Sequence, residues 1–100
     1  MHAIEVPVTG GPEVLTYVER PEPVPGPGQV LIKAEAVGVN FIDTYFRSGL
    51  YPRELPFVVG TEVCGTIAAV GPDVPVLNVG DRVVTANADG AYAEYSLAPS

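Results

Sequence analysis

The sequence of 100 residues predicts a mainly β fold, either a barrel or a sandwich, with one short helix. Three observations lead to this prediction. About six short runs are rich in β-branched and aromatic residues, and turn-forming residues separate them. Only one segment combines helix-capping residues with the apolar spacing of a helix. The chain also lacks the alternation of strands and helices that builds a parallel sheet.

The first predicted element is an N-terminal hairpin. Residues 2–8 (HAIEVPV) are expected to form the first strand. Gly10-Gly11-Pro12 then predicts a turn, because glycine reaches positive φ and proline sets the direction of the chain that follows. Residues 14–19 (VLTYVE) are rich in β-formers and are expected to return beside the first strand.

A proline-rich connection precedes the longest predicted strand. Residues 21–28 hold four prolines and two glycines, which favours a stiff, extended surface loop. Such a segment is also typical of SH3 and WW ligands, but the strands predicted on both sides favour the loop. Residues 29–39 predict a half-buried strand. Lys33 and Glu35 lie on its exposed face, and the other face carries Val30, Ile32, Ala34 and Ala36.

Residues 41–48 (FIDTYFRS) form the single predicted helix. Asn40 is a favoured N-cap, Asp43 stands at the third helical position as in a capping box, and Gly49 suits the C-terminal end. One face of this helix is apolar and is made of Phe41, Ile42, Tyr45 and Phe46. Residues 50–57 contain two prolines and are expected to be an irregular loop.

The stretch of residues 60–74 (GTEVCGTIAAVGPDV) is the centre of the chain. It contains Gly60, Gly65 and Gly71, and residues 66–70 between the last two favour a strand. Glycine within a strand marks a bulge, a bend or a close approach of another backbone or a ligand. We therefore expect the backbone to be folded tightly here.

The last third of the chain predicts two turns and two strands. Pro72-Asp73 and residues 79–81 are turn sequences, and residues 82–86 are expected to be a strand. Residues 87–90 predict a loop whose Asp-Gly pair is a hairpin signal. Residues 91–97 (AYAEYSL) alternate and are expected to be the last strand.

The composition is that of a globular protein, with 47% hydrophobic and 17% charged residues. The net charge of −7 argues against nucleic-acid and anionic-membrane partners, which require clustered Lys and Arg. No apolar run reaches the roughly 20 residues of a membrane span, and the N-terminus lacks the basic start of a signal peptide. The single cysteine, Cys64, is expected to be a small core residue. A cytoplasmic protein is the expectation.

Several motifs resemble a known superfamily. Residues 60–74 are similar to the GHE-x-x-G-x5-G-x-x-V pattern of the medium-chain dehydrogenases/reductases, with one departure. Thr61 stands where the zinc-dependent alcohol dehydrogenases have a histidine ligand. Five further segments resemble the zeta-crystallin-like quinone oxidoreductases of this superfamily, at residues 10–15, 39–45, 47–52, 79–83 and 90–95. In order, the resemblance runs over essentially the whole chain.

The resemblance implies a GroES-like, partly open β-barrel. In these enzymes this barrel is the N-terminal catalytic domain, so residues 1–100 are expected to be this domain of a longer enzyme. A Rossmann α/β domain, absent from this chain, is expected downstream, because no glycine-rich turn followed by a helix is present here. That domain would bind most of the NADPH and make the contacts of a homodimer.

The resemblance also implies zinc-independent transfer of reducing equivalents from NADPH to a quinone. At positions of zinc ligands the chain has Asn40 and Thr61, whose amide and hydroxyl groups bind zinc poorly. An NADPH-dependent enoyl or alkenal double-bond reductase is the alternative within the superfamily, with an enone as substrate. A non-catalytic binding or structural module of the same fold is the alternative from another class.

By resemblance, Tyr45 and Tyr51 line the pocket for nicotinamide and quinone and are the candidate catalytic residues. Asn40, Tyr45 and Thr61 are the candidate cofactor-binding residues. Other interpretations stay open, since Asn40 can simply cap the helix and Tyr45 can belong to the core with Phe41 and Ile42.

The charged residues near these candidates have simpler expected roles. Asp43 completes the capping box, and Arg47 and Arg53 are expected to be solvated, with a cofactor phosphate as the alternative partner. Glu62 lies in an apolar run and must be paired or hydrogen-bonded, and we expect a structural ion pair with Arg82.

Overall fold

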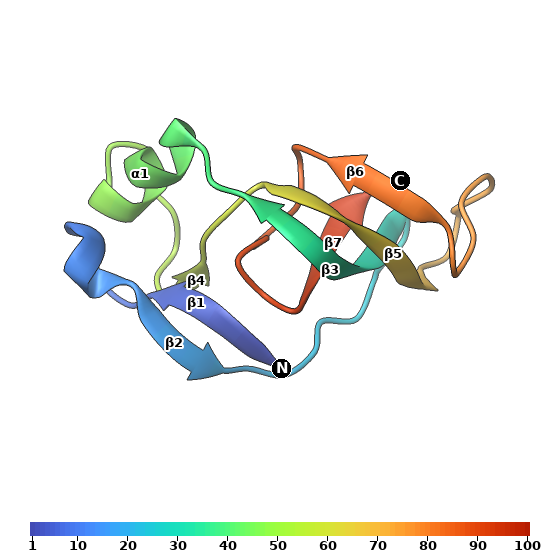
Figure 1. The fold of residues 1–100 in the computed structure, drawn as a ribbon, viewed down its shortest axis with the longest axis horizontal. Coiled ribbons are helices and arrows are strands. Elements are labelled where there is room, and N and C mark those ends of the chain that lie inside the picture. The colour runs from blue at the N-terminus through green and yellow to red at the C-terminus, as the bar shows by residue number, and fades with distance from the viewer.

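Two antiparallel sheets and one helix make up the computed structural model, which describes residues 1–100 (Figure 1). The smaller sheet has the order β2-β1-β4, from Thr16–Glu19, His2–Val6 and Phe57–Val58. The larger has the order β6-β5-β3-β7, from Arg82–Thr85, Glu62–Val70, Gln29–Gly38 and Tyr95–Pro99. The helix α1, Phe41–Ser48, lies at the end of the molecule near the smaller sheet. The predicted mainly β fold with one short α-helix is therefore confirmed.

The N-terminal hairpin is confirmed, although both of its strands are shorter than predicted. β1 ends at Val6 because Pro7 has no N–H to donate to a neighbouring strand. A turn of 3-10 helix, Pro12–Val14, replaces a simple turn, so β2 begins at Thr16. Pairing of Ile4 with Tyr17 sets the register.

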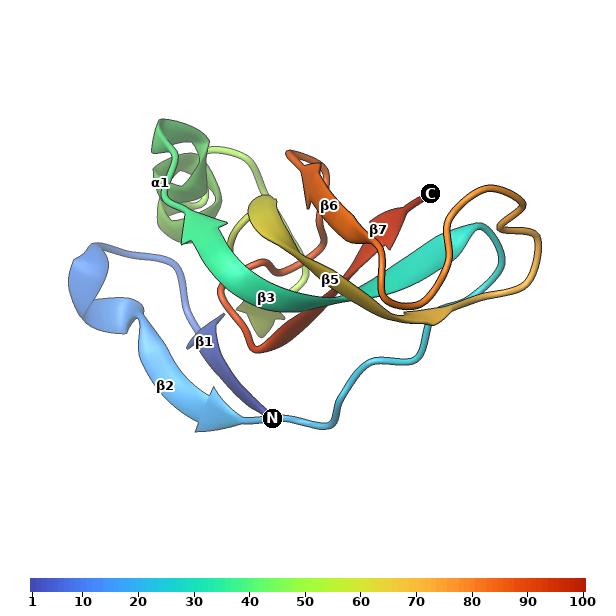
Figure 2. The ribbon, with the colours of Figure 1, turned by 45° about the vertical axis from the view of Figure 1, so that its right-hand side comes forward.

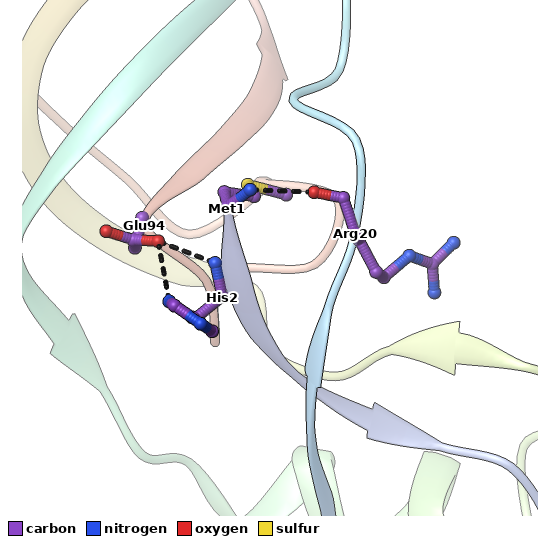
Figure 3. Close-up of polar contacts among 4 residues, drawn as sticks. All are labelled: Met1, His2, Arg20 and Glu94. Atoms are coloured by element: carbon purple, nitrogen blue, oxygen red, sulfur yellow. Dashed lines mark hydrogen bonds and ion pairs between the residues drawn. The ribbon is translucent and has the colours of Figure 1, made fainter.

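Hydrogen bonds of the first two residues hold this hairpin in place (Figure 3). The Met1 amino group donates to the Arg20 carbonyl at 2.8 Å, and the His2 backbone N–H donates to Glu94 Oε1 at 2.5 Å. The His2 ring also stacks on Tyr17, with centroids 5.0 Å apart. The open end of the hairpin is thus hydrogen-bonded to Glu94, which follows His2 by 92 residues in the sequence.

The strand β3 lies at the centre of the larger sheet, between β5 and β7 (Figure 2). Its predicted inward residues Val30 and Ile32 belong to the main core, which also contains Val63, Ile67, Ala88, Ala91 and Ala98. The predicted alternation holds only in part, since Leu31 is also buried and Ala36 is exposed. The first half of β3 is therefore covered on both faces, and its second half is open to solvent.

The glycines of residues 60–74 allow close backbone approach, as predicted. A Cβ on Gly65 would overlap with the Lys33 carbonyl of the neighbouring strand β3. A Cβ on Gly71 would overlap with the Gly26 carbonyl, in the proline-rich connection. These contacts are with the protein's own backbone, which explains the glycines without any ligand.

The hairpin predicted at Asp89-Gly90 is wrong. β6 pairs with β5 and β7 pairs with β3, so the two strands that flank this loop are not neighbours. Gly90 does turn the chain, with φ of 79°, but its N–H donates to the Gly60 carbonyl. A local turn signal identifies the bend, whereas the pairing of the strands depends on the whole sheet.

The last strand begins at Tyr95, four residues later than predicted. Residues 91–94 bridge the two sheets instead: the Tyr92 carbonyl accepts from the Ile4 N–H at 2.8 Å, and the Glu94 carbonyl accepts from the Ala34 N–H at 2.9 Å. The predicted turns at Pro72-Asp73 and residues 79–81 are present, with positive φ at Asp73 and Gly80.

Candidate functional site

An open cleft of about 580 Å³ lies where the start of α1 meets the chain around Gly60 and the end of β6. Its lining is half apolar and includes two of the predicted cofactor-binding residues, Asn40 and Thr61. The other lining residues are Ile42, Phe46, Glu62, Ala86, Asn87 and Ala88. Side chains from three separate parts of the sequence therefore meet at this cleft.

The start of α1 places Asn40 at the edge of the cleft. The predicted capping box is present, and the Asp43 carboxylate accepts from the Asn40 backbone N–H at 3.0 Å. Gly49, with φ of 90°, ends the helix in the left-handed conformation that glycine adopts without strain. Both helix ends are thus specified locally, and this holds Asn40 in an extended conformation before the first turn.

The Asn40 side chain is oriented by Glu62. Its Nδ2 donates to Glu62 Oε1 at 3.2 Å, and both residues line the cleft. Glu62 lies opposite Gly38 in the β3–β5 pairing, and the missing side chain of Gly38 leaves room for its carboxylate. The two interpretations of Asn40, a helix cap and a residue of the cleft, are therefore compatible.

The predicted ion pair between Glu62 and Arg82 is wrong. The β5–β6 register places Arg82 opposite Thr66, four residues along the strand from Glu62 and about 13 Å away. Arg82 instead donates to Glu35 Oε2 at 2.9 Å. Glu62 Oε1 instead accepts from the neutral amide of Asn40.

Tyr45 and Tyr51 lie beside the cleft but do not line it. The Tyr45 ring meets the Phe41 ring edge-on at 5.4 Å and the Tyr51 ring at 5.2 Å. Tyr51 also contacts Phe46, which does line the cleft, at 5.8 Å. These four rings form an aromatic cluster that continues the cleft along α1.

The alternative that Tyr45 belongs to a core with Phe41 and Ile42 is wrong. The Phe41 side chain is 75% exposed and Ile42 is 39% exposed, so neither forms a core. Phe46 alone of the predicted apolar face packs against the smaller core, around Val6, Phe57 and Val59. Half of the predicted apolar face of the helix, Phe41 and Ile42, is therefore exposed to solvent, and Tyr45 and Phe46 are half-buried.

Arg47 and Arg53 both have protein partners, contrary to the expectation of solvated side chains. Arg47 Nε donates to the Gly10 carbonyl at 3.1 Å. Arg53 pairs with Asp89 at 2.9 Å, and its guanidinium lies over the Phe57 ring at 5.0 Å. Arg53 lines a second hollow, of about 480 Å³, away from Asn40 and Thr61.

Tyr92 is the residue near the site that the sequence did not single out. Its hydroxyl donates to Asp43 Oδ2 at 2.7 Å, across 49 residues of sequence. Burial and the Asp43 carboxylate raise the pKa of Tyr92 well above its ordinary value near 10. The phenol therefore stays protonated and remains a donor. No local pattern around Tyr92 marks this contact.

The donors at the cleft do not fit catalytic zinc. Asn40 offers an amide, Thr61 a hydroxyl and Glu62 a single carboxylate, whereas zinc sites use about three His, Cys or carboxylate ligands. No group of three or more His, Cys, Asp or Glu side chains is placed to hold a metal ion. Cys64, half-buried in β5, is the single free thiol.

Comparison with known proteins defines the class first. Residues 26–100 match the model of the alcohol dehydrogenase GroES-like domain, and the chain belongs to this family. Relatives that are named quinone oxidoreductases match nearly the whole chain. A quinone oxidoreductase of Lama guanicoe is 50% identical over 98% of this chain, which covers 31% of that relative.

Two solved structures agree with this assignment. A mycobacterial quinone oxidoreductase superposes with a TM-score of 0.96 at 68% identity, over 99% of this chain and 31% of that one. A mycobacterial protein in complex with NADPH gives a TM-score of 0.95 at 70% identity, over 99% of this chain and 30% of that one. The chain thus spans about a third of the length of these relatives.

Proposed function

We propose that residues 1–100 are the N-terminal catalytic domain of an NADPH-dependent quinone oxidoreductase that works without zinc. The observation that carries this proposal is the half-apolar cleft with an amide and a hydroxyl on its walls and an aromatic cluster beside it. The relatives named as quinone oxidoreductases, and the mycobacterial protein solved with NADPH, support it.

In this proposal the chain positions two flat rings and keeps water away from them. When bound, NADPH supplies the hydride, and the quinone is already electrophilic, so no strong base or nucleophile is required. Asn40 and Thr61 hold the polar edge of the nicotinamide. Tyr45 and Tyr51 offer phenol faces to the quinone and hydroxyls to its carbonyl oxygens.

Most of the NADPH contacts are assigned to a Rossmann domain of the longer protein. The described residues contain no glycine-rich turn that leads from a strand into a helix. The 100 residues alone are therefore proposed to bind NADPH weakly and to be inactive. The longer protein is proposed to be a homodimer in the cytoplasm, a reducing compartment in which Cys64 stays a free thiol. No helix in the structure has the length and hydropathy needed to cross a membrane.

The experiment is oxidation of NADPH by the full-length protein with 1,4-benzoquinone, with and without a zinc chelator. We expect turnover that the chelator does not change. Loss of turnover with the chelator would contradict zinc independence. Turnover with an enone but not with the quinone would assign a double-bond reductase, and absence of any NADPH fluorescence change would favour a non-catalytic module.

A further inference from the structure

The only fully buried side chain of α1 is an acid, Asp43, which is 4% exposed. A buried carboxylate lowers stability unless hydrogen bonds compensate it. Oδ2 accepts from the Asn40 backbone N–H at 3.0 Å and from the Tyr92 hydroxyl at 2.7 Å, whereas buried Oδ1 has no protein partner. A buried acid with hydrogen bonds to only one of its two oxygens does not stabilise the fold as well as an apolar side chain would, so stability alone does not explain Asp43.

Tyr92, the partner of Asp43, is held firmly by its own backbone. Its N–H donates to the Val59 carbonyl at 2.9 Å, and its carbonyl accepts from the Ile4 N–H at 2.8 Å. Its ring lies against Gly60, where a Cβ would overlap with the ring. The phenol hydroxyl is therefore presented to Asp43 from a fixed position between β1 and the chain before β5.

These contacts connect two walls of the cleft. Asp43 holds Asn40 through its backbone N–H, and the Tyr92 ring covers Gly60, the residue before Thr61. Asn40 and Thr61 both line the cleft but belong to segments 21 residues apart. The Asp43–Tyr92 hydrogen bond joins the helix start to Tyr92, which in turn contacts Gly60 through its ring and Val59 through its backbone N–H.

The geometry assigns to Asp43 and Tyr92 the role of positioning residues that set the separation of Asn40 and Thr61 across the cleft. This inference rests on the proposed function, since it concerns how the site holds nicotinamide and quinone in reacting distance. A small change of that separation lowers the rate more than the affinity, because hydride transfer depends on close alignment of the two rings.

The raised pKa of Tyr92 supports this role. Burial and the neighbouring Asp43 carboxylate keep the phenol protonated, so the hydrogen bond persists across the neutral pH range. A hydrogen bond that sets the separation of two segments must be formed in every molecule. The Tyr92 phenol meets this condition because it stays protonated and can always donate to Asp43.

The test uses the full-length protein with two pairs of variants. Tyr92→Phe removes the hydroxyl, and Tyr17→Phe is its control, because Tyr17 is 69% exposed and its ring stacks on His2, away from the cleft. Asp43→Asn removes the charge but keeps one acceptor oxygen, and Asp73→Asn is its control at an exposed turn. The readouts are kcat and KM for NADPH and quinone, together with Tm.

We expect Tyr92→Phe to lower kcat about tenfold while KM for quinone stays within about twofold, because alignment is lost rather than affinity. Asp43→Asn is expected to lower kcat about threefold, and both controls are expected to match the wild type. A folded Tyr92→Phe protein with wild-type kcat, whatever its Tm, would overturn the inference. Failure of both test variants to fold would assign a purely structural role and would also overturn it.

A separate readout distinguishes this inference from the proposed function. If the wild type does not oxidise NADPH with a quinone, the proposed function fails, and amide hydrogen exchange then decides the positioning role. Faster exchange at residues 40–43 and 60–61 in Tyr92→Phe, but not in Tyr17→Phe, would support the link between the two walls. Unchanged exchange at both segments would overturn it.

Discussion

The larger sheet and the α1 end of the molecule differ in the interactions that hold them together. The larger sheet encloses a core of seven buried apolar residues, whereas the smaller sheet and α1 share only three. At the α1 end, Phe41 is 75% exposed and Leu50 is 64% exposed, and the one buried helix side chain is Asp43. Apolar packing therefore dominates the first region, and hydrogen bonds set the geometry of the second, where the candidate site lies.

The largest predicted effect compares two valines with no exposed surface, one in each core. Val63→Ala in the larger core is expected to cost about 3 kcal/mol of unfolding free energy, and Val6→Ala in the smaller core about 1.5 kcal/mol. The smaller cluster has fewer neighbours and can collapse around the lost methyl groups. Chemical denaturation of the full-length protein measures both, with exposed Val84→Ala as the control. Equal losses would show that the two regions do not differ in packing.

The next effect concerns backbone approach in the larger sheet. Gly65→Ala is expected to lower the unfolding free energy by about 2 kcal/mol, because the new Cβ would meet the Lys33 carbonyl and push β3 and β5 apart. Gly26→Ala is the control, since its Cβ would meet only the Gln29 side chain, at 3.4 Å. Thermal unfolding compares the two, and a Gly65→Ala protein as stable as the control would refute the close approach.

At the α1 end the expected effect is on activity as well as on stability, because Asn40 is both a helix cap and a residue of the cleft. Asn40→Ala removes the donor to Glu62 and the amide of the cleft wall, and it is expected to lower kcat/KM about tenfold, or about 1.4 kcal/mol. Asn78→Ala, in an exposed loop, is the matched control. Steady-state kinetics of the full-length protein measure kcat/KM. A change in Tm without loss of kcat/KM would contradict a role of Asn40 in the site.

The smallest effect is expected at Glu94, an exposed residue whose contacts with His2 are drawn in Figure 3. The backbone N–H of His2 is the main cause that lowers the pKa of this carboxyl below its ordinary value. A lowered folded-state pKa stabilises the fold above the unfolded value of about 4.3, and this contribution is lost as the pH falls through the folded-state pKa. Glu94→Gln should therefore lower Tm slightly at pH 7 and leave it unchanged at pH 2.5. An equal decrease at both pH values would exclude the charge as the cause.

Much of the fold could be predicted because its signals are local. The helix over residues 41–48, its capping box and the Gly49 end all depend on residues within one or two turns. The turns at Asp73 and Gly80 depend on single backbone conformations. Hydrophobic alternation identified most strands. It failed at Leu31, which is buried although the pattern places it on the face opposite Val30 and Ile32.

The candidate site was predicted only in part. Asn40 and Thr61 do meet in one cleft, whereas Tyr45 and Tyr51 lie beside it, and their roles stay a prediction. The partner of Glu62 was predicted wrongly, and Tyr92 was not identified at all. The hydrogen bonds Asn40–Glu62, Arg82–Glu35 and Tyr92–Asp43 join residues 22 to 49 positions apart in the sequence. They therefore depend on strand register rather than on sequence neighbours.

The sequence by itself determined most of the strands, the helix and the turns, where glycine must stand, and the family to which the chain belongs. It missed the short strand β4, whose Phe57 was expected in an irregular loop. Only the tertiary structure decided that β6 and β7 take different neighbours, that Arg82 pairs with Glu35, and that Tyr92 reaches Asp43. The physical reason is the range of the forces involved. Caps and turns satisfy backbone groups within a few residues, whereas sheet register, set by burial of a whole face, decides which distant side chains meet.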